Sequence, residues 1–331
     1  MAGGRAGAPV AVSEALRLLP IDAATYVGHS LHAPDRDWPE TNCYVDLWVE
    51  VLHALGHDPV AGLAFTLAVG FDGDQWEFFK YPAEDLLTLY GIQVREINVW
   101  RSLEDHIATH LALGHLLTVE ADSWYLPDTA GVAYRLTHQK TTIVPQYLDP
   151  AQRRIGYFHN AGYFELEGED YDGVLRTAEP DGLVPYVELV ALEHQVHLDP
   201  VALRAQVMEL VGRYVARRPA TNPVAQLAAR ITADLPWLRE HPDLFHAYAF
   251  GSLRQCGAWA SVAAMFVRWL DDPAVAGAAE HLDAISALAK TAQFKLARVL
   301  AVRTVDLDEQ LSTMAAHWHD ALTTLAAAYG S

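Results

Sequence analysis

The stretch NCYVDLWVEVLHALG, residues 42–56, decides the first part of the fold. Its apolar residues recur at the i, i+3, i+4 and i+7 spacing of a helix with one buried face, over residues 44–55. Asn42 is a good N-cap residue, and Gly56 suits the position that follows a helix C-terminus. The pattern therefore predicts a well-defined amphipathic helix, with Cys43 just inside its start.

The chain after this helix mixes helical and strand patterns. We expect further helices over 82–90 and 103–112, and strands over 94–100, 116–121, 134–147 and 155–159. Asp149 and Pro150 form a turn sequence between the last two strands, which predicts an antiparallel hairpin. A helix followed by an antiparallel sheet indicates an α+β domain.

Composition changes near residue 180, where the sequence becomes rich in Ala, Leu and Val. A run of turn-forming residues, Glu179-Pro180-Asp181-Gly182, separates the two regions. We therefore expect an α+β domain over 1–180 and an all-α helical bundle over 181–331. The predicted helices of the bundle cover 200–215, 223–235, 244–270, 275–302 and 307–329.

The net charge of −19 disfavours bulk binding to nucleic acid or to an anionic membrane. Residues 1–179 hold 26 acidic and 11 basic residues, and the remainder holds 16 and 12. The two cysteines cannot make a disulfide framework, and no apolar run is long enough to span a membrane. The N-terminus lacks the apolar run of a signal peptide. We expect a cytoplasmic protein with no membrane partner.

Cys43 is the candidate nucleophile. The N–H groups and dipole at a helix N-terminus stabilise a thiolate, and a nucleophilic cysteine needs a base with an orienting group. His138 lies near the start of one predicted hairpin strand and Asn160 at the end of the next. This order predicts a Cys-His-Asn triad in which His138 takes the thiol proton and Asn160 fixes its tautomer. The Cys43 N–H, with the Asn42 or Thr41 side chain, would form the oxyanion hole.

Other interpretations of these residues remain open. A cysteine at a helix start is often a small buried hydrophobe. His159 competes with His138 for the role of base, because it precedes Asn160 at the same strand end. Cys43, His138 and His159 would also suit a metal ion, but no CxxC or HxxxH pattern supports a metal site. Phosphate-binding glycine loops are absent, and no cofactor is expected.

Five segments resemble an uncharacterised bacterial family whose members commonly occur near amino acid:carrier protein ligases. The resemblance is close over most of the first half and loose over the helical half. It rests on ETNCYVDLW (40–48), GDQW (73–76), LPDT (126–129), HQKTT (138–142) and YFHNAGY (157–163).

The order of Cys43, a strand histidine and a hairpin asparagine is also similar to butirosin biosynthesis protein H. That resemblance implies a papain-like N-terminal domain and acyl transfer from a carrier-protein thioester to an amine, with Cys43, His138 and Asn160 as the triad. The third residue is often Asp in the butirosin-type proteins and is Asn here. No upstream glutamine for the oxyanion hole is evident.

Further residues are candidates for binding. Lys290 and the three basic residues after it form a positive helix face, which is either an ordinary solvated face or a docking patch for a polyanionic donor. The candidates for donor docking are Lys290, Lys295, Arg298 and Arg303. The candidates for substrate binding are Thr41, Asn42, Asp122, Lys140, His159 and Arg254, the last for a substrate carboxylate.

The leading hypothesis is an acyltransferase, and specifically an aminoacyl transferase. Cys43 would take an amino acid from an acyl or peptidyl carrier protein, whose phosphopantetheine arm carries it, or from aminoacyl-tRNA. The acceptor would be a small-molecule amine or hydroxyl. The alternatives are a cysteine peptidase or amidase with the same triad, and a non-catalytic binding protein on a papain-like scaffold.

Overall fold

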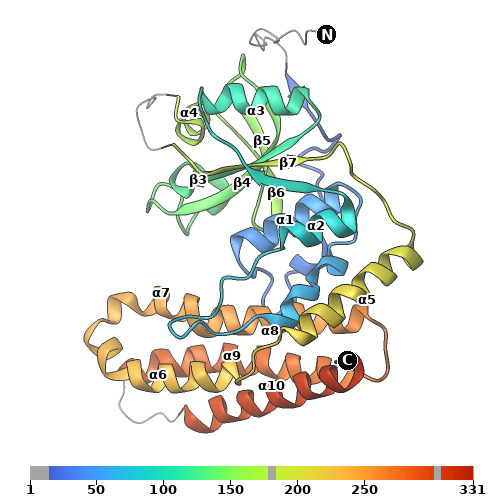
Figure 1. Cartoon of the computed structure of the whole chain (residues 1–331). Helices are drawn as coiled ribbons and strands as arrows, with labels where there is room; N and C mark the ends of the chain where they lie inside the picture. Colours follow the sequence, from blue (N-terminus) through green and yellow to red (C-terminus); the bar gives the residue numbers. More distant parts are fainter. Residues whose placement is uncertain (1–14, 178–183, 302–306, 331) are drawn as a thin grey trace.

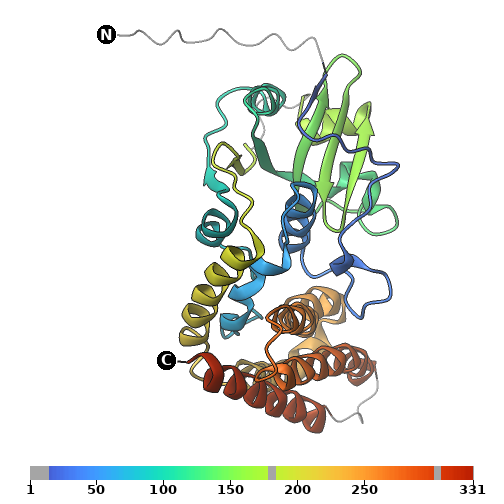
Figure 2. The ribbon, with the colours of Figure 1, turned by 90° about the vertical axis from the view of Figure 1, so that its right-hand side faces the viewer.

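The computed structural model describes residues 15–177, 184–301 and 307–330 of the chain. Figure 1 shows these residues in two parts, a sheet with flanking helices and, below it, a group of longer helices. The helices from residue 200 onward form the lower part, and α5 (Pro200–Ala216) connects the two, as Figure 2 shows from a second direction. The protein is therefore an α+β protein with a helical C-terminal part.

Among the described residues, seven strands form one antiparallel sheet. Its order is β2-β7-β3-β4-β5-β6, and β1 pairs with β4. The strands are β1 (Leu16–Arg17), β2 (Gln93–Glu96), β3 (Leu116–Asp122), β4 (Lys140–Asp149), β5 (Arg154–His159), β6 (Gly162–Glu167) and β7 (Val187–Ala191). β4 lies at the centre, because its β-branched residues at 141–144 suit a pleated, buried surface.

Helix α1 (Cys43–Ala54) packs against β4, β5 and β6. All its residues from Tyr44 to Leu52 are buried, including the two carboxylates Asp46 and Glu50. The sequence predicts one apolar face for this helix, but residues 26–32 cover its polar face as well. The other helices of this part are α2 (Ala83–Tyr90), α3 (Leu103–Ala112) and α4 (Glu169–Leu175), with the 3₁₀ helix η2 (Val60–Ala68).

The helical part is a bundle in which α9 packs against both α8 and α10. Its elements after α5 are α6 (Pro223–Glu240), η5 (Pro242–Leu244), α7 (Phe245–Ala249), the π-helical turn η6 (Phe250–Arg254), α8 (Gln255–Trp269), α9 (Ala276–Ala301) and α10 (Asp308–Tyr329). α8 also packs on η2, where the Trp259 indole donates a hydrogen bond to the Thr66 carbonyl at 2.7 Å. Buried aromatic packing and hydrogen bonds therefore hold the two parts together.

Within the described parts of the chain, no helix has the length and apolar content needed to cross a bilayer.

The predicted helices at 44–55 and 103–112, the hairpin of β4 and β5, and the helical second half are confirmed. The strand predicted over 134–147 is wrong at its start, because the chain turns there: Arg135 has a φ of 56° and β4 begins at Lys140. The predicted division near residue 180 lies outside the described residues. The sheet continues beyond it, since β7 pairs with both β2 and β3.

Candidate functional site

Cys43 is the first residue of α1, and its surroundings hold the helix start in place. The Asn42 side-chain oxygen accepts hydrogen bonds from the N–H groups of Tyr44 (3.1 Å) and Val45 (3.0 Å). The Asn42 amide donates to the Phe79 carbonyl at 3.1 Å. Among the described hydrogen bonds, none uses the Cys43 N–H. This N–H is therefore available to the oxyanion that forms on a substrate carbonyl when the sulfur attacks it.

The Cys43 thiol is largely buried beside Thr141. Burial raises the pKa of the thiol, and this effect exceeds the lowering by the Lys140 charge and by the neighbouring Thr141 hydroxyl. The resting group is therefore a thiol, so the helix start alone does not produce the thiolate that the sequence predicts. A nearby base is needed to activate it.

A line of buried hydrogen bonds continues from Thr141. Its Oγ1 lies 2.8 Å from Nε2 of His159, and Nδ1 of His159 lies 2.5 Å from Oδ2 of Asp128. The His159 side chain is 0% exposed and that of Asp128 is 4% exposed. Because the carboxylate accepts the Nδ1 proton, Nε2 is left as the acceptor for the Thr141 hydroxyl. Cys43, Thr141, His159 and Asp128 thus form one connected chain of side chains.

His138 lies in a different environment. Its Nδ1 is 2.6 Å from Oδ2 of Asp122, its ring stacks on Trp124 with 4.5 Å between ring centroids, and its side chain is 66% exposed. Asn160 occupies the two-residue turn between β5 and β6 with a φ of 45°. Among the described hydrogen bonds, none joins Cys43 to His138 or Asn160, and none joins those two residues to each other.

The difference from the predicted triad has a physical reason. Because β4 starts at Lys140, His138 precedes the strand and pairs with Asp122 at the end of β3. The structure brings His159 to Thr141 instead. His159 was already a competing base in the sequence, but Asp128, the residue that orients it, was missed. The signal available for Asp128 was the polar segment 122–128 that follows a strand.

The two other predicted oxyanion donors are already engaged. The Thr41 hydroxyl donates to Oδ1 of Asp46 at 2.5 Å, and the Thr41 N–H donates to Oδ2 at 2.8 Å. The Asn42 amide is bound to Phe79, as described above. These side chains therefore position the start of α1 and leave the Cys43 N–H as the donor beside the sulfur.

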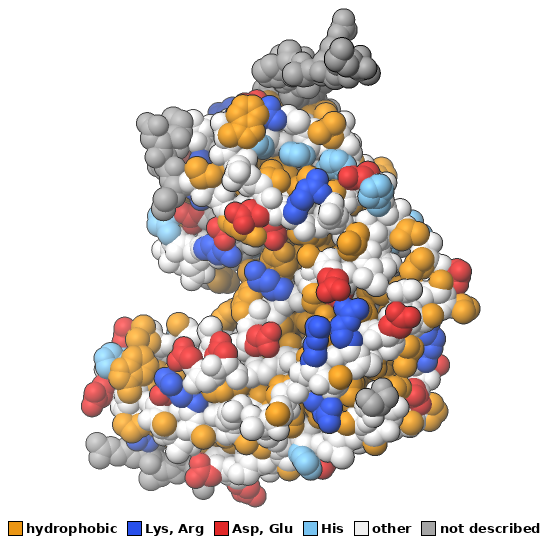
Figure 3. Space-filling model, in the orientation of Figure 1, with side chains coloured by type: hydrophobic (Ala, Val, Ile, Leu, Met, Phe, Trp, Pro, Cys, Tyr) orange, Lys and Arg blue, Asp and Glu red, His pale blue; other side chains and the backbone are white. Residues whose placement is uncertain are grey.

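Arg254 reaches this site from the helical part. It is the last residue of η6 and donates from Nη1 to the Thr41 carbonyl at 3.2 Å, while the Gln255 amide reaches the same carbonyl at 3.4 Å. The start of α1 is therefore located where the two parts of the protein meet. Figure 3 shows that the surface is hollowed between these two parts.

A polar cavity of about 250 Å³ lies beside the starts of α1 and β4, where Tyr44 and Lys140 line it, and Cys43 itself is not among its lining residues. Glu188 on β7 accepts hydrogen bonds from the hydroxyl groups of Tyr44 (2.8 Å), Thr118 (2.9 Å) and Tyr186 (3.2 Å). Lys140 is paired with Glu120 at 3.1 Å. The ion pairs of the described residues include none to Glu188. The lining residues are Tyr44, Lys80, Thr118, Glu120, Lys140, Thr142, Tyr186 and Glu188.

A second buried cluster was missed from the sequence. His32 lies between two carboxylates of α1, with Nε2 at 3.3 Å from Asp46 and Nδ1 hydrogen-bonded to Glu50. Burial lowers the pKa of His32, but the hydrogen bonds and charges of Asp46 and Glu50 outweigh it and raise this pKa to about 9. His32 is therefore a charged structural link between residues 26–32 and α1.

The predicted docking residues lie on α9. Lys290 donates to the Asp37 carbonyl at 2.7 Å, and its ammonium group lies over the Trp38 ring at 5.6 Å. Lys295 is partly buried and Arg298 is exposed. Arg303 lies outside the described residues. Lys290 thus contacts the N-terminal part of the protein. Of the predicted docking residues that the structure describes, Arg298 is exposed to solvent.

Two family models match the chain. The DUF1839 N-terminal domain matches residues 27–192, and the DUF1839 C-terminal domain matches residues 201–327. The first match ends just after β7 and the second begins with α5. No curated protein matches the chain.

Proposed function

The chain belongs to the DUF1839 family, and for this member we propose an acyl transfer reaction in which Cys43 is the nucleophile. The observation that carries the proposal is the hydrogen-bonded chain from Thr141 through His159 to Asp128, with the Cys43 thiol at its outer end. It contains the nucleophile, base and orienting group that covalent catalysis requires. The uncommitted N–H of Cys43 adds an oxyanion donor.

The first half-reaction moves an acyl group onto the enzyme. The Cys43 sulfur attacks the carbonyl carbon of a thioester while its proton passes to Thr141 Oγ1 and the Thr141 hydroxyl proton passes to Nε2 of His159. The new bond is the Cys43 thioester, and the broken bond releases the donor thiolate, which takes a proton from water. A neutral amine acceptor then attacks the Cys43 thioester, the bond between the carbonyl carbon and the Cys43 sulfur breaks, and an amide forms. The proton held on His159 returns through Thr141 to the Cys43 sulfur, and the proton lost by the amine nitrogen neutralises the hydroxide left when the donor thiolate took its proton from water.

The burial of His159 favours a thioester donor over a peptide. Breaking an amide requires a proton on the leaving nitrogen, which papain-type enzymes supply from the histidine. His159 is fully buried, and its Nε2 is occupied by Thr141. A thiolate leaves without such protonation, so a sequestered base is sufficient. This is why acyl transfer from a thioester is preferred to peptidase or amidase activity.

The polar cavity lined by Tyr44 and Glu188, near the start of α1, supports an aminoacyl group. Glu188 receives three hydroxyl hydrogen bonds and lacks an ion-pair partner among the described residues. A carboxylate of this kind would stabilise the ammonium group of an aminoacyl thioester. The volume of about 250 Å³ is sufficient for one amino acid side chain with its ammonium group.

An acyl or peptidyl carrier protein is the preferred donor, because the net charge of −19 disfavours a tRNA. The phosphopantetheine arm would supply the thioester, and the exposed Arg298 on α9 would contact the single phosphate of that arm. The phosphopantetheine would then belong to the donor, and the proposed reaction at Cys43 would use protein side chains alone. Aminoacyl-tRNA is the competing donor and is included in the test.

The test is the intact mass of the protein after mixing with aminoacyl-pantetheine thioesters. We expect a single adduct with the mass of the aminoacyl group on the wild type and on Cys256→Ala, because Cys256 is fully buried. Cys43→Ala should give no adduct. Parallel reactions with aminoacyl-tRNA and with a peptide ester distinguish the donors.

Two results would overturn the proposal. An adduct that persists in Cys43→Ala would exclude Cys43 as nucleophile. The absence of an adduct with every donor, together with normal iodoacetamide labelling of Cys43, would instead support a binding protein that lacks catalysis.

A further inference from the structure

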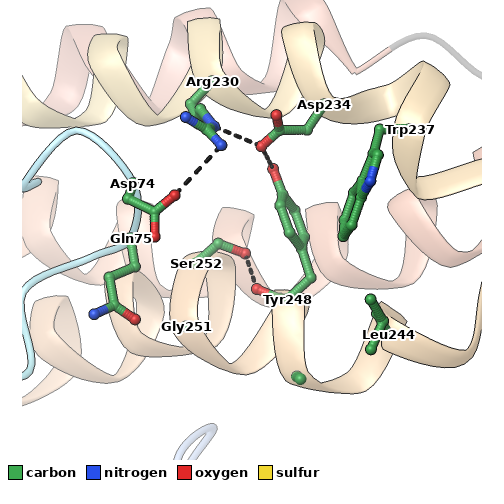
Figure 4. Close-up of a pocket in the computed structure, with 10 residues that line it drawn as sticks. Asp74, Gln75, Arg230, Asp234, Trp237, Leu244, Tyr248, Gly251 and Ser252 are labelled. Carbon is green, nitrogen blue, oxygen red and sulfur yellow. Dashed lines mark hydrogen bonds and ion pairs between the residues drawn. The ribbon is translucent and has the colours of Figure 1, made fainter. Parts of the chain in front are cut away.

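A cavity of about 520 Å³ lies between α6 and the α7–η6 segment, closed at one end by the loop that carries Asp74 and Gln75 (Figure 4). This volume falls in the range of small-molecule sites, roughly 300–1,000 Å³. It is lined by charged groups at one end and by apolar side chains at the other. The Cys43 site does not use it.

Arg230 on α6 is held at the charged end by two carboxylates. Its Nε lies 2.7 Å from Oδ2 of Asp234, and its Nη2 lies 3.3 Å from Asp74. The Tyr248 hydroxyl donates to the same Asp234 oxygen at 3.0 Å. The Asp74 side chain is 80% exposed, so its ion pair with Arg230 is weak and easily exchanged. A carboxylate ligand can take that place on the guanidinium and leave Asp74 free for a cation.

The apolar end is formed by Trp237 and Leu244. Their side chains remain 45% and 39% exposed, although both are large and apolar. Figure 4 shows Trp237 descending from α6 beside the Tyr248 ring, with Leu244 below it. These groups offer an apolar surface directly beside the charged end, which is the arrangement that orients an amphipathic ligand.

The wall between them is the π-helical turn η6. Gly251 and Ser252 of this turn line the cavity. The Gly251 carbonyl accepts a hydrogen bond at 2.8 Å from the backbone N–H of Trp76, which lies outside the helix. π-helical turns occur frequently at functional sites. Because Arg254 at the far end of η6 contacts Thr41, the cavity is adjacent to the Cys43 site but separate from it.

We propose that this cavity binds a small zwitterion with an apolar body, the chemistry of an α-amino acid with an apolar side chain. The ligand carboxylate binds the Arg230 guanidinium, the ammonium group binds Asp74 and Asp234, and the body packs on Trp237 and Leu244. Both charge signs and the exposed apolar surface are used by one ligand. The proposal does not depend on the reaction assigned to Cys43.

Isothermal titration calorimetry of the full chain tests it with three probes: L-phenylalanine, phenethylamine and 3-phenylpropionate. We expect saturable binding of L-phenylalanine at one site. Each of the other two probes lacks one charged group and should bind at least about 10-fold more weakly, because a charge-assisted hydrogen bond is lost.

Variants assign the contacts. Arg230→Gln should weaken the binding of L-phenylalanine about 10-fold, since the contact to its carboxylate is lost. The affinity for phenethylamine, which has no carboxylate, should change by less than about 3-fold. Trp237→Ala should weaken all three probes. The matched control is Arg268→Gln, which removes an exposed helix ion pair with Asp283 outside the cavity and should change nothing.

Two outcomes overturn the proposal whatever the result at Cys43. One is the absence of saturable binding by any probe to the folded wild type. The other is binding that Arg230→Gln and Trp237→Ala leave unchanged, which would place the probe elsewhere. Thermal unfolding of each variant shows that it is folded, and Arg230→Lys serves as a second variant that keeps the charge.

Discussion

Asp128 and His159 form a buried pair in which Oδ2 of the carboxylate lies 2.5 Å from the imidazole Nδ1. The second oxygen of Asp128 accepts a hydrogen bond from the Tyr157 hydroxyl, also at 2.5 Å. Asp128 belongs to the turn after β3, whereas Tyr157 and His159 belong to β5. The pair therefore joins this turn to the sheet and orients the imidazole toward Thr141.

Replacing Asp128 should destabilise the fold. Asp128→Ala leaves His159 and Tyr157 without their buried acceptor, and breaking a buried pair in this way costs about 3–5 kcal/mol. Urea unfolding measures the change. The control is Asp122→Asn, which loses the charge paired with the exposed His138 but keeps an oxygen to accept from the Trp124 N–H, and there we expect less than about 1 kcal/mol. Equal losses in the two variants would contradict a special role for the buried pair.

The two histidines should differ in their effect on the reaction of Cys43. His159→Gln removes the base and should slow formation of the aminoacyl adduct at least about 10²-fold. His138→Gln should alter it less than about 3-fold, because His138 is bound to Asp122 and exposed to solvent. Reactions quenched at successive times and measured by intact mass give the rate of adduct formation in each variant. The opposite ranking would restore the triad predicted from the sequence.

Alkylation of Cys43 should be slow at neutral pH. Burial raises the pKa of this thiol, so the thiolate fraction and the iodoacetamide rate should increase until the pH is above the ordinary cysteine range. Lys140→Ala should shift the profile to still higher pH, because the Lys140 charge lowers this pKa. Glu120→Gln, which releases Lys140 from its ion pair, is the complementary variant. A profile centred below pH 8 would contradict the assigned surroundings.

Stability should depend on pH through His32. Its folded pKa of about 9 exceeds the unfolded value of about 6.5, so its contribution is complete below pH 6.5 and is lost as the pH rises through 9. A shift of this size corresponds to on the order of 3 kcal/mol. Chemical unfolding between pH 6 and 10 measures it. His32→Gln should be less stable at pH 6 and should show a flatter profile, and an unchanged slope would refute the assignment.

Much of the secondary structure was predictable. Apolar periodicity located α1, α3 and the helices of the C-terminal part, because each of these patterns is set by residues within a few turns of one another. The helical tract predicted at 244–270 contains one departure, the π-helical turn η6. There the Gly251 carbonyl bonds to Trp76, a partner far away in the sequence, so no local pattern indicates it.

The candidate site was only partly predictable. Asn42 as cap and Cys43 at the helix start follow from adjacent residues, and the structure has both. The choice between His138 and His159 depends on where β4 begins: the predicted strand starts at residue 134 and includes His138, whereas β4 starts at Lys140 and leaves His138 before it. Asp128 is brought to His159 from a turn 31 residues away. Contacts between such distant segments follow no fixed spacing in the sequence, so no local pattern predicts them.

The sequence by itself thus determined which segments are helical, that α1 is capped at Asn42, and that a cysteine stands at that cap, because these properties depend on local backbone hydrogen bonds and apolar spacing. The tertiary structure alone decided that Thr141 lies beside Cys43 and bonds to His159, that Asp128 orients His159, and that His32 is held between Asp46 and Glu50. Those relationships depend on strand register and on chain segments brought together across the fold, where burial strengthens each hydrogen bond. The fold therefore decides which of the sixteen histidines bonds to Thr141 and Asp128.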